Sequence, residues 1–408
     1  MNIAVAQSGG PTAAINSSLA GVFRAARDNP DIERIYGAVN GIEGVIGGNL
    51  VPLDSILTSE SDIELLKKTP STVLGSCRYK LAEYDPADSV TESEYMNIIN
   101  TFEEYGIGAF FYIGGNDSMD TVMKLNRYIK AVGKDIKVIG VPKTIDNDLP
   151  CTDHTPGFGS AAKYVATTLQ EIIRDSRVYS IQSITIVEIM GRNAGWLTAS
   201  TSVLRANGEP APHLIYLPES CPEGFDTEKF LEDVSRMMKR YRAVIIAVSE
   251  GIVPRDRDYV KLGADAFGHT DNSGVAKYLE KICRDKFGCK VRSVELNVMQ
   301  RCGAHIASLT DIEEAEKIGA AAVHCALGGE SGKMMGFRRI SSEPYRVEII
   351  PFDVELAANS EKFFPEKWIT RDLCDVTMDA MSYFLPLIQG EVQTEYRNGI
   401  PVHFRLNQ

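Results

Sequence analysis

The chain has 408 residues, of which 44% are hydrophobic and 24% charged, values that are ordinary for a folded globular protein. Its 55 acidic residues outnumber the 43 lysines and arginines, giving a net charge of −12. Neither nucleic acid nor an anionic membrane surface is an expected partner of so acidic a chain. No apolar run approaches the ~18 residues of a membrane-spanning helix.

The N-terminal stretch MNIAVAQSGG has no basic region and only a short apolar run, so it predicts a first strand and not a signal peptide. The eight cysteines include no CxxC pair, and together with the six histidines they show no zinc-binding spacing. Buried, reduced thiols in a cytoplasmic enzyme are therefore the expectation.

Strand-like and helix-like segments alternate along the chain. Asn2–Ala6 predicts the first strand, and a helix with an apolar face from Ile15 to Ala26 follows it. The further predicted strands are Ala109–Ile113, Lys137–Val141, Ser183–Ile189, Leu214–Leu217 and Ala243–Val248. The predicted helices between and after them include 158–175, 194–206 and 226–241. Asp311 and Glu314 have the spacing of a capping box, which predicts another helix start.

This alternation predicts an α/β fold with mostly parallel sheets that helices cover on both faces. The chain shows no low-complexity linker and no repeat of fixed period. We therefore expect two doubly wound lobes that exchange segments, with a change of lobe near 157–160 and a return near 300. In such sheets ligands bind beyond the carboxyl ends of the strands.

Two glycine pairs follow predicted strands. Gly9-Gly10 would let a phosphate approach the backbone and the start of a helix, although a plain tight turn is the alternative. Gly114-Gly115 is followed by Asn116 and Asp117, whose oxygens suit a phosphate or magnesium site. An aspartate at this position can also be only a helix cap.

The segment Pro142–Asp148, with the sequence PKTIDND, is the most informative. Asp146 and Asp148 stand two residues apart beside Lys143 and Thr144. Two neighbouring carboxylates cost energy unless a cation or a reacting group uses them. One can act as a base on a hydroxyl while the other helps to hold Mg²⁺, and the lysine can offset phosphoryl charge. An ordinary polar turn is the alternative.

Charged residues beside glycines recur at other predicted strand ends. Arg192 follows Gly191, Glu250 precedes Gly251, and Arg78 follows a Gly-Ser pair. Arg292 and Arg301 flank a further segment. Each arginine alone is more often a solvated surface residue, but together they suit a sugar-phosphate ligand. The absence of GxxxxGK[ST], and of GxGxxG after the first strand, argues against a P-loop and a nicotinamide site.

The motifs SGGPTAAINSSLAG, GGNDS, PKTIDNDL, GFGSA, EIMGRNAGW, VSEG and QRCG, in this order, resemble the phosphofructokinase family. They extend from residue 8 to about residue 303. The resemblance implies two α/β lobes with the active site in the cleft between them, and transfer of a phosphoryl group to the 1-hydroxyl of fructose 6-phosphate. It also implies Mg²⁺ as cofactor and a homodimer or homotetramer.

Two positions indicate the branch of that family. ATP users are expected to have GGDGS and PGTIDND, whereas this chain has Asp117 and Lys143 at the variable positions. It therefore resembles the pyrophosphate-dependent branch. A carboxylate at Asp117 would repel the α-phosphate of ATP, and Lys143 can bind the leaving phosphate.

The resemblance implies roles for the matching residues. Asp146 would be the base, with Lys143 and Asp117 as the other catalytic residues. Pyrophosphate would be bound by Gly10, Asp117, Lys143 and Arg78. Fructose 6-phosphate would be bound by Thr144, Ile145, Asp146, Met190, Gly191, Arg192, Glu250, Arg301 and, from a neighbouring subunit, Arg292. Asn116, which stands where the family has aspartate, and Asp148 would help to hold magnesium.

The implied division of the chain is a donor lobe of residues 1–157 and 300–354, a sugar-phosphate lobe of residues 158–299, and a C-terminal extension of residues 355–408. Two other functions stay open. One is an ATP-dependent 6-phosphofructokinase, since more than two residues can decide the donor. The other is a catalytically silent sugar-phosphate sensor, which the neutral Asn116 suggests, although a binding-only site has no need of a base such as Asp146.

Overall fold

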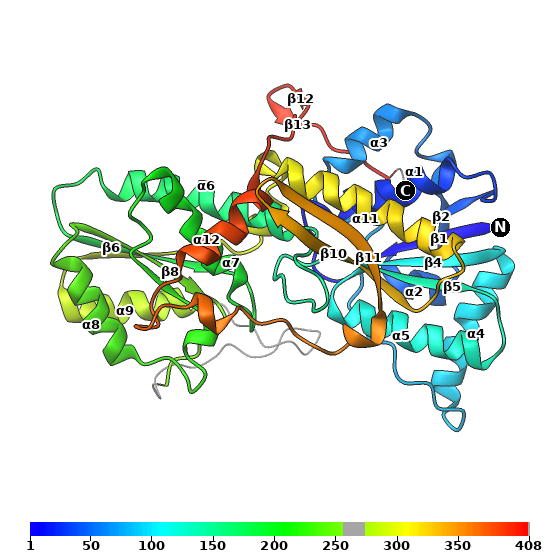
Figure 1. Ribbon diagram of the computed structural model, residues 1–408, viewed down its shortest axis with the longest axis horizontal. Helices are drawn as coiled ribbons and strands as arrows, with labels where there is room; N and C mark the ends of the chain where they lie inside the picture. The colour runs from blue at the N-terminus through cyan, green and yellow to red at the C-terminus, as the bar shows by residue number, and fades with distance from the viewer. Residues whose placement is uncertain (256–273, 407–408) are drawn as a thin grey trace.

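The computed structural model describes residues 1–255 and 274–406, which form two β-sheets side by side along the long axis (Figure 1). The strands of the first sheet, in spatial order, are β11 (Tyr345–Asp353), β10 (Lys333–Ser342), β5 (Lys137–Pro142), β4 (Ile107–Gly114), β1 (Asn2–Gln7), β2 (Ile35–Ala38) and β3 (Leu50–Pro52). Those of the second are β7 (Leu214–Tyr216), β8 (Ala243–Ser249), β6 (Ser183–Ile189) and β9 (Lys290–Glu295). All pairings except β2–β3 and β10–β11 are parallel in these two sheets, which confirms the predicted fold class.

Helices cover both faces of the first sheet because successive side chains of its strands point to opposite sides. Ile3 and Val5 of β1 lie in one buried cluster, and Ala4 and Ala6 lie in another. The first cluster packs against α1 (Ile15–Arg27), α3 (Glu60–Lys67) and α11 (Leu309–Leu327). The second packs against α2 (Gly41–Ile46), α4 (Ser89–Glu104) and α5 (Asn116–Ala131).

The second sheet is covered in the same way. Val187 and Ile189 of β6 face α6 (Phe158–Ser176), α7 (Trp196–Ala199) and α12 (Met378–Phe384). Ile184 and Ile186 face α8 (Thr227–Met238) and α9 (Val275–Phe287) on the other side. No helix of the described residues is long and apolar enough to cross a membrane.

Helix α11 packs on the first sheet, in what is here called the first lobe, and also contacts α6 of the second lobe, which is built on the second sheet. A Cβ on Gly21 of α1 would lie 1.9 Å from the carbonyl oxygen of Glu316, so only glycine permits this close packing of α1 on α11. The predicted helix start near Asp311 is confirmed, since α11 begins at Leu309, but the capping box of Asp311 and Glu314 is wrong because Ser308 is the N-cap residue. The Asp311 carboxylate instead accepts hydrogen bonds from the backbone amides of Gly157 (2.9 Å) and Ser160 (3.0 Å), at the start of α6.

The predicted helix 194–206 is shorter than expected. Residues 200–207 form a 3₁₀ helix after the single turn of α7. Ser200 and Thr201 donate their hydroxyls to the carbonyls of residues three positions earlier, Leu197 and Thr198. Such side-chain bonds compete with regular α-helical bonding.

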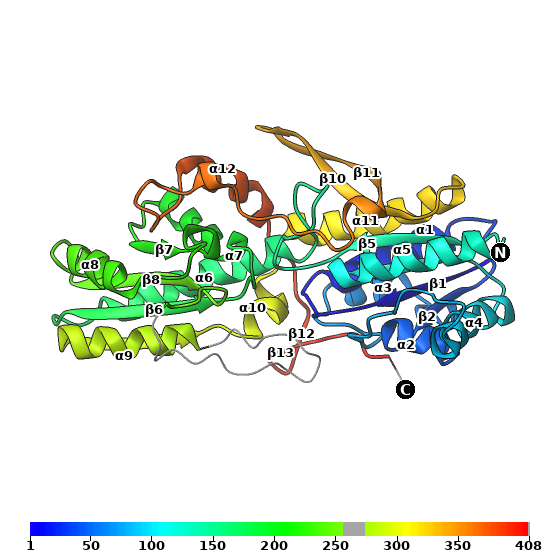
Figure 2. The same cartoon turned by 90° about the horizontal axis from the view of Figure 1, so that it is seen from below.

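The last fifty residues run across both lobes. Phe364 and Phe384 are buried in the core of the second lobe, whereas Phe404 packs against the first. The Phe404 amide donates to the Thr69 hydroxyl at 2.8 Å. A short hairpin of β12 (Tyr396–Arg397) and β13 (Ile400–Pro401) lies on this path, as Figure 2 shows from below. The boundaries given above for two lobes and an extension stay predictions.

Candidate active site

A cavity of about 350 Å³ lies at the carboxyl ends of β1, β4 and β5, facing the second lobe. Every residue that the sequence assigned to the site lines it, except Gly191 and Arg292. The lining residues among them are Gly10, Arg78, Asn116, Asp117, Lys143, Thr144, Ile145, Asp146, Asp148, Met190, Arg192, Glu250 and Arg301. Parallel strands bring the ends of distant segments to one edge, which is why residues 133 positions apart in the chain meet here.

Lys143 is buried at the inner side of the cavity, with 3% of its surface exposed. Its Nζ donates a hydrogen bond to the Gly10 carbonyl at 2.7 Å. A Cβ on Gly9, whose φ is +73°, would come within 3.3 Å of the same Nζ, so the glycine loop leaves room for the lysine. Burial lowers the pKa of Lys143 to about 7, and the nearby Asp146 opposes that shift.

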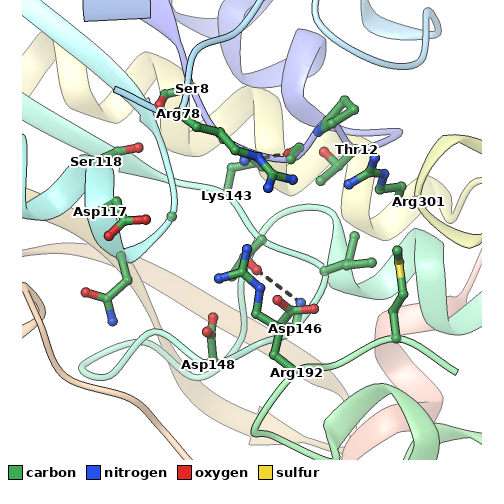
Figure 3. Close-up of a pocket in the computed structure, with 18 of the residues that line it drawn as sticks. Ser8, Thr12, Arg78, Asp117, Ser118, Lys143, Asp146, Asp148, Arg192 and Arg301 are labelled. Atoms are coloured by element: carbon green, nitrogen blue, oxygen red, sulfur yellow. Dashed lines mark hydrogen bonds between the residues drawn. The ribbon is translucent and has the colours of Figure 1, made fainter. Parts of the chain in front are cut away.

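Asp146 and Asp148 lie on the turn after β5, and both side chains face the cavity (Figure 3). The Asp146 amide donates to the Thr144 hydroxyl at 3.1 Å, which fixes the turn. Burial raises the pKa of Asp146 to about 6, although Arg192 and other cations oppose it. Burial, and then the charge of Asp146, raise the pKa of Asp148 to about 7. Protons or a cation would relieve this crowding of negative charge.

The turn that carries Arg192 is held by the carboxylate of Glu250, which directly follows the neighbouring strand β8. The amides of Gly191 and Arg192 donate to Oε1 of Glu250 at 3.2 and 3.1 Å. Gly191 has a φ of +152°, and a Cβ there would lie 2.5 Å from the Ala194 carbonyl. Gly191 therefore shapes the turn although its atoms do not line the cavity.

Four cationic side chains converge on the cavity, namely Arg78, Lys143, Arg192 and Arg301 (Figure 3). Burial and the charge of Arg78 lower the pKa of Arg301, which indicates crowding of like charge. A Cβ on Gly10 would lie 3.2 Å from Nη1 of Arg301, so the glycine loop and this arginine face the same space. Such a cluster in an acidic protein is suited to a ligand with several phosphate charges.

Asn116 and Asp117 begin α5 at the opposite side of the cavity. The Asn116 Oδ1 accepts from the Asn359 amide at 2.7 Å, and its Nδ2 donates to the Ser360 carbonyl. The amide expected to contact magnesium is thus bonded to the C-terminal extension. Asp117 lies 4.0 Å from the ammonium of Lys80, a partner that sequence analysis missed. Within residues 1–255 and 274–406, no group of three or more His, Cys, Asp or Glu side chains is arranged to hold a metal by itself.

Arg292 lies away from this cavity, on β9. Its Nη1 is 2.7 Å from Oδ2 of Asp175, and both side chains are exposed. The two residues line a small surface depression together with Tyr179 and Lys290. Arg292 therefore does not contribute to the cavity of its own chain.

Sequence analysis did not assign roles to the hydroxyls of Ser8, Thr12 and Ser118, which also line the cavity. The Thr12 hydroxyl accepts from the amide of Ile15, the first residue of α1, at 3.0 Å. Ser118 packs so closely on Gly114 that a Cβ there would lie 1.9 Å from the Ser118 hydroxyl. Their place within the SGGPT and GGNDS motifs was the signal that could have identified them.

Comparison with known proteins identifies the family of this chain. The family profile described as phosphofructokinase matches residues 2–326. The pyrophosphate–fructose 6-phosphate 1-phosphotransferase of Halomonas elongata is 37% identical over 98% of this chain and 94% of its own length. The protein of the same name from Methylococcus capsulatus is 38% identical over 99% of this chain and 96% of its own length. The crystal structure of the pyrophosphate-dependent phosphofructokinase from Marinobacter aquaeolei matches with a TM-score of 0.87 and 38% identity, covering 100% of this chain and 96% of that one. The motifs and the two sheets of this chain, together with these similarities, place it in the phosphofructokinase family.

Proposed function

We propose that this protein transfers a phosphoryl group from pyrophosphate to the 1-hydroxyl of fructose 6-phosphate, reversibly, giving fructose 1,6-bisphosphate and phosphate. The observation that carries the proposal is the buried Lys143 beside Gly10, at the position where ATP users of the family are expected to have glycine. The names of the relatives at 37–38% identity support the same donor.

The chemistry follows from the placement of charge. Asp146 orients the sugar hydroxyl and accepts its proton as the phosphoryl group arrives. Lys143, with Arg78 on the same side, stabilises the departing phosphate because its positive charge faces the bond that breaks. Arg192 and Arg301 bind the sugar phosphate, and Glu250, which also lines the cavity, holds the turn of Arg192.

The residues fit a magnesium ion that the substrate shares. Asp148 and Asp117 line one cavity, and burial together with the charge of Asp146 raises the pKa of Asp148, so a cation beside it would be stabilising. When bound, Mg²⁺ would neutralise part of the pyrophosphate charge. Asp148 would hold it through water, and the Asn116 carbonyl would be its weakest protein ligand because Asn359 already bonds to it.

A homo-oligomer is part of this proposal. Arg292 lies exposed and outside its own cavity, which supports a role at the sugar-phosphate site of a neighbouring subunit. We also propose a cytoplasmic location, which all eight cysteines in the free thiol state support. We also propose lobe boundaries at residues 157 and 300, which the strand order supports: β5 of the first sheet ends before residue 157, β6 to β9 of the second sheet lie between the boundaries, and β10 of the first sheet follows residue 300.

The experiment is a coupled assay with fructose 6-phosphate and either pyrophosphate or ATP, at matched Mg²⁺. We expect turnover with pyrophosphate and little or none with ATP. Turnover with ATP alone would identify an ATP-dependent 6-phosphofructokinase. No turnover with either donor, but binding of fructose 6-phosphate by calorimetry, would identify a silent sensor.

A further inference from the structure

Residues 359–364 of the C-terminal extension, here named the strap, lie against three loops of the cavity. The Asn359 amide bonds to Asn116 at 2.7 Å, and the Asn359 side chain donates to Asp120 Oδ1 at 2.8 Å. The strap is thereby joined to the first two turns of α5, the helix that begins with Asn116 and Asp117. The family motifs stop before this segment, near residue 303.

The middle of the strap is bonded to the turn that carries the two carboxylates. The Lys362 amide donates to the Asp148 carbonyl at 2.6 Å. Its side-chain Nζ donates to the carbonyls of Thr152 (3.0 Å) and Asp153 (2.9 Å) and to Oδ1 of Asn147 (3.3 Å). Burial lowers the pKa of Lys362 to about 8, so the ammonium stays mostly charged at neutral pH.

Asn147 is the residue between Asp146 and Asp148, and it is wholly buried with a left-handed φ of +54°. Both ends of its amide are bonded to the extension. Oδ1 accepts from Lys362, and Nδ2 donates to the Tyr383 hydroxyl at 3.0 Å. The Tyr383 hydroxyl in turn donates to the Asp153 carbonyl at 2.6 Å. The conformation of the turn thus depends on two side chains that lie more than 200 residues further along the chain.

The strap also reaches the turn that carries Arg192. Glu361 accepts from the Asn193 side chain at 3.3 Å, and the Lys362 carbonyl accepts from Trp196 Nε1 at 2.9 Å. The Lys362 ammonium lies 4.9 Å from the centre of the Trp196 ring. The strap therefore contacts three parts of the cavity wall: the start of α5, the turn that carries Asp146 and Asp148, and the turn that carries Arg192.

We propose that Lys362 is a positioning residue for phosphoryl transfer: through Asn147 and the carbonyls of Thr152 and Asp153 it fixes the turn that aims Asp146 and Asp148 into the cavity. The inference rests on the function proposed above. It assigns no substrate contact to Lys362, whose ammonium is bonded on the protein side of the turn.

The test is Lys362→Met, which removes the ammonium but keeps a long apolar side chain against Trp196. The matched control is Lys367→Met, since Lys367 belongs to the same extension and also lies over a tryptophan ring, at 5.8 Å from the centre of Trp368. We expect kcat of Lys362→Met to fall about 10-fold or more because a small misplacement of a reacting group is costly. KM for fructose 6-phosphate should change less than about threefold, since the groups that bind it remain.

A second variant keeps the proposal testable if Lys362→Met folds poorly. Tyr383→Phe removes the other bond to Asn147, and we expect a similar fall in kcat. The loss in the double variant should be smaller than the product of the single losses, because both act through one turn.

The outcomes separate the two proposals. If wild type and Lys367→Met show no pyrophosphate-dependent turnover, the proposed function is wrong. If both are active and the kcat of Lys362→Met and Tyr383→Phe, per folded molecule, matches the control, the positioning role alone is wrong. A lower melting temperature with unchanged kcat would likewise overturn it.

Discussion

The ammonium of Lys143 and the carbonyl of Gly10 are joined by a hydrogen bond of 2.7 Å, although 133 residues separate them in sequence. This bond fixes the buried amino group of Lys143 against the glycine loop that follows β1. A lysine here takes space beside the loop, whereas a glycine would leave that space open. The choice of phosphoryl donor should therefore depend on this contact and on Asp117 across the cavity.

The first prediction concerns the donor. Asp117→Gly should admit ATP, because it removes a negative charge from the place proposed for the α-phosphate. The double change Asp117→Gly with Lys143→Gly should use ATP better than either single variant, since repulsion and occlusion act on one site. Lys143→Gly alone should lower pyrophosphate-dependent kcat about 100-fold or more. Steady-state rates with each donor would measure this, and a double variant that still ignores ATP would contradict it.

The second prediction concerns the base. Asp146→Asn should lower kcat by about 10²–10⁴-fold and change KM for fructose 6-phosphate little, because the amide can still accept a hydrogen bond but cannot take a proton. A fluorescence or calorimetric titration would check that the variant still binds the sugar phosphate. A variant with nearly normal kcat would make Asp146 a structural residue of the turn.

The third prediction concerns pH. Asp146 must be ionised to act as a base, and burial holds its pKa at about 6 and that of Asp148 at about 7. Both carboxyls are charged above these values and neutral below them, so kcat/KM should fall as the pH drops from 7 to below 6. The two groups repel each other and titrate as a pair. Asp148→Asn should therefore shift the fall of kcat/KM on the acidic side of the pH profile to lower pH. If this fall occurs at the same pH as in wild type, another group controls it.

The fourth prediction concerns the neighbouring subunit. Asp146→Asn and Arg292→Ala homo-oligomers should each be nearly inactive. If Arg292 completes a neighbour's site, mixed dimers contain one site with both residues intact. Equal mixing after reversible dissociation should then restore about a quarter of wild-type activity. Sedimentation would confirm the exchange of subunits, and a fully active monomer or no recovery in verified mixed dimers would refute the shared site.

The fifth prediction concerns stability. Asp311→Ala should lower the free energy of unfolding by about 1–3 kcal/mol, because two amides at the start of α6 lose a buried acceptor. Urea denaturation would measure the loss. Glu313→Ala is the matched control, since Glu313 is exposed on the same helix and should change stability by less than about 0.5 kcal/mol.

The alternation of strands and helices could be predicted because each buried strand carries its own apolar pattern; Ser183–Ile189 has the predicted bounds. The assembly of the cavity could also be predicted, since the ends of parallel strands meet at one edge. The contact of Asp311 with the start of α6 could not, because local spacing pointed to its own helix whereas the Gly157 amide that it accepts from lies 154 residues earlier.

The contacts of the C-terminal extension with the active-site turn could not be predicted from local sequence patterns. Nothing near Lys362 or Tyr383 in sequence marks them as neighbours of Asn147, because the contact depends on how both lobes pack. Asn116 is a similar case. Its position after a strand indicated a magnesium ligand, yet its amide bonds to Asn359 and Ser360, 243 and 244 residues away.

The order of the strands has a consequence for synthesis on the ribosome. The second sheet is complete once residue 295 has been made, whereas β5 of the first sheet obtains its neighbour β10 only after residue 333. Until then β5 is an exposed edge of the nascent chain, and an exposed edge can pair with other chains. The sheet that is begun first is therefore finished last, and a chaperone that shields a growing polypeptide would have its longest task at the strands of the N-terminal half.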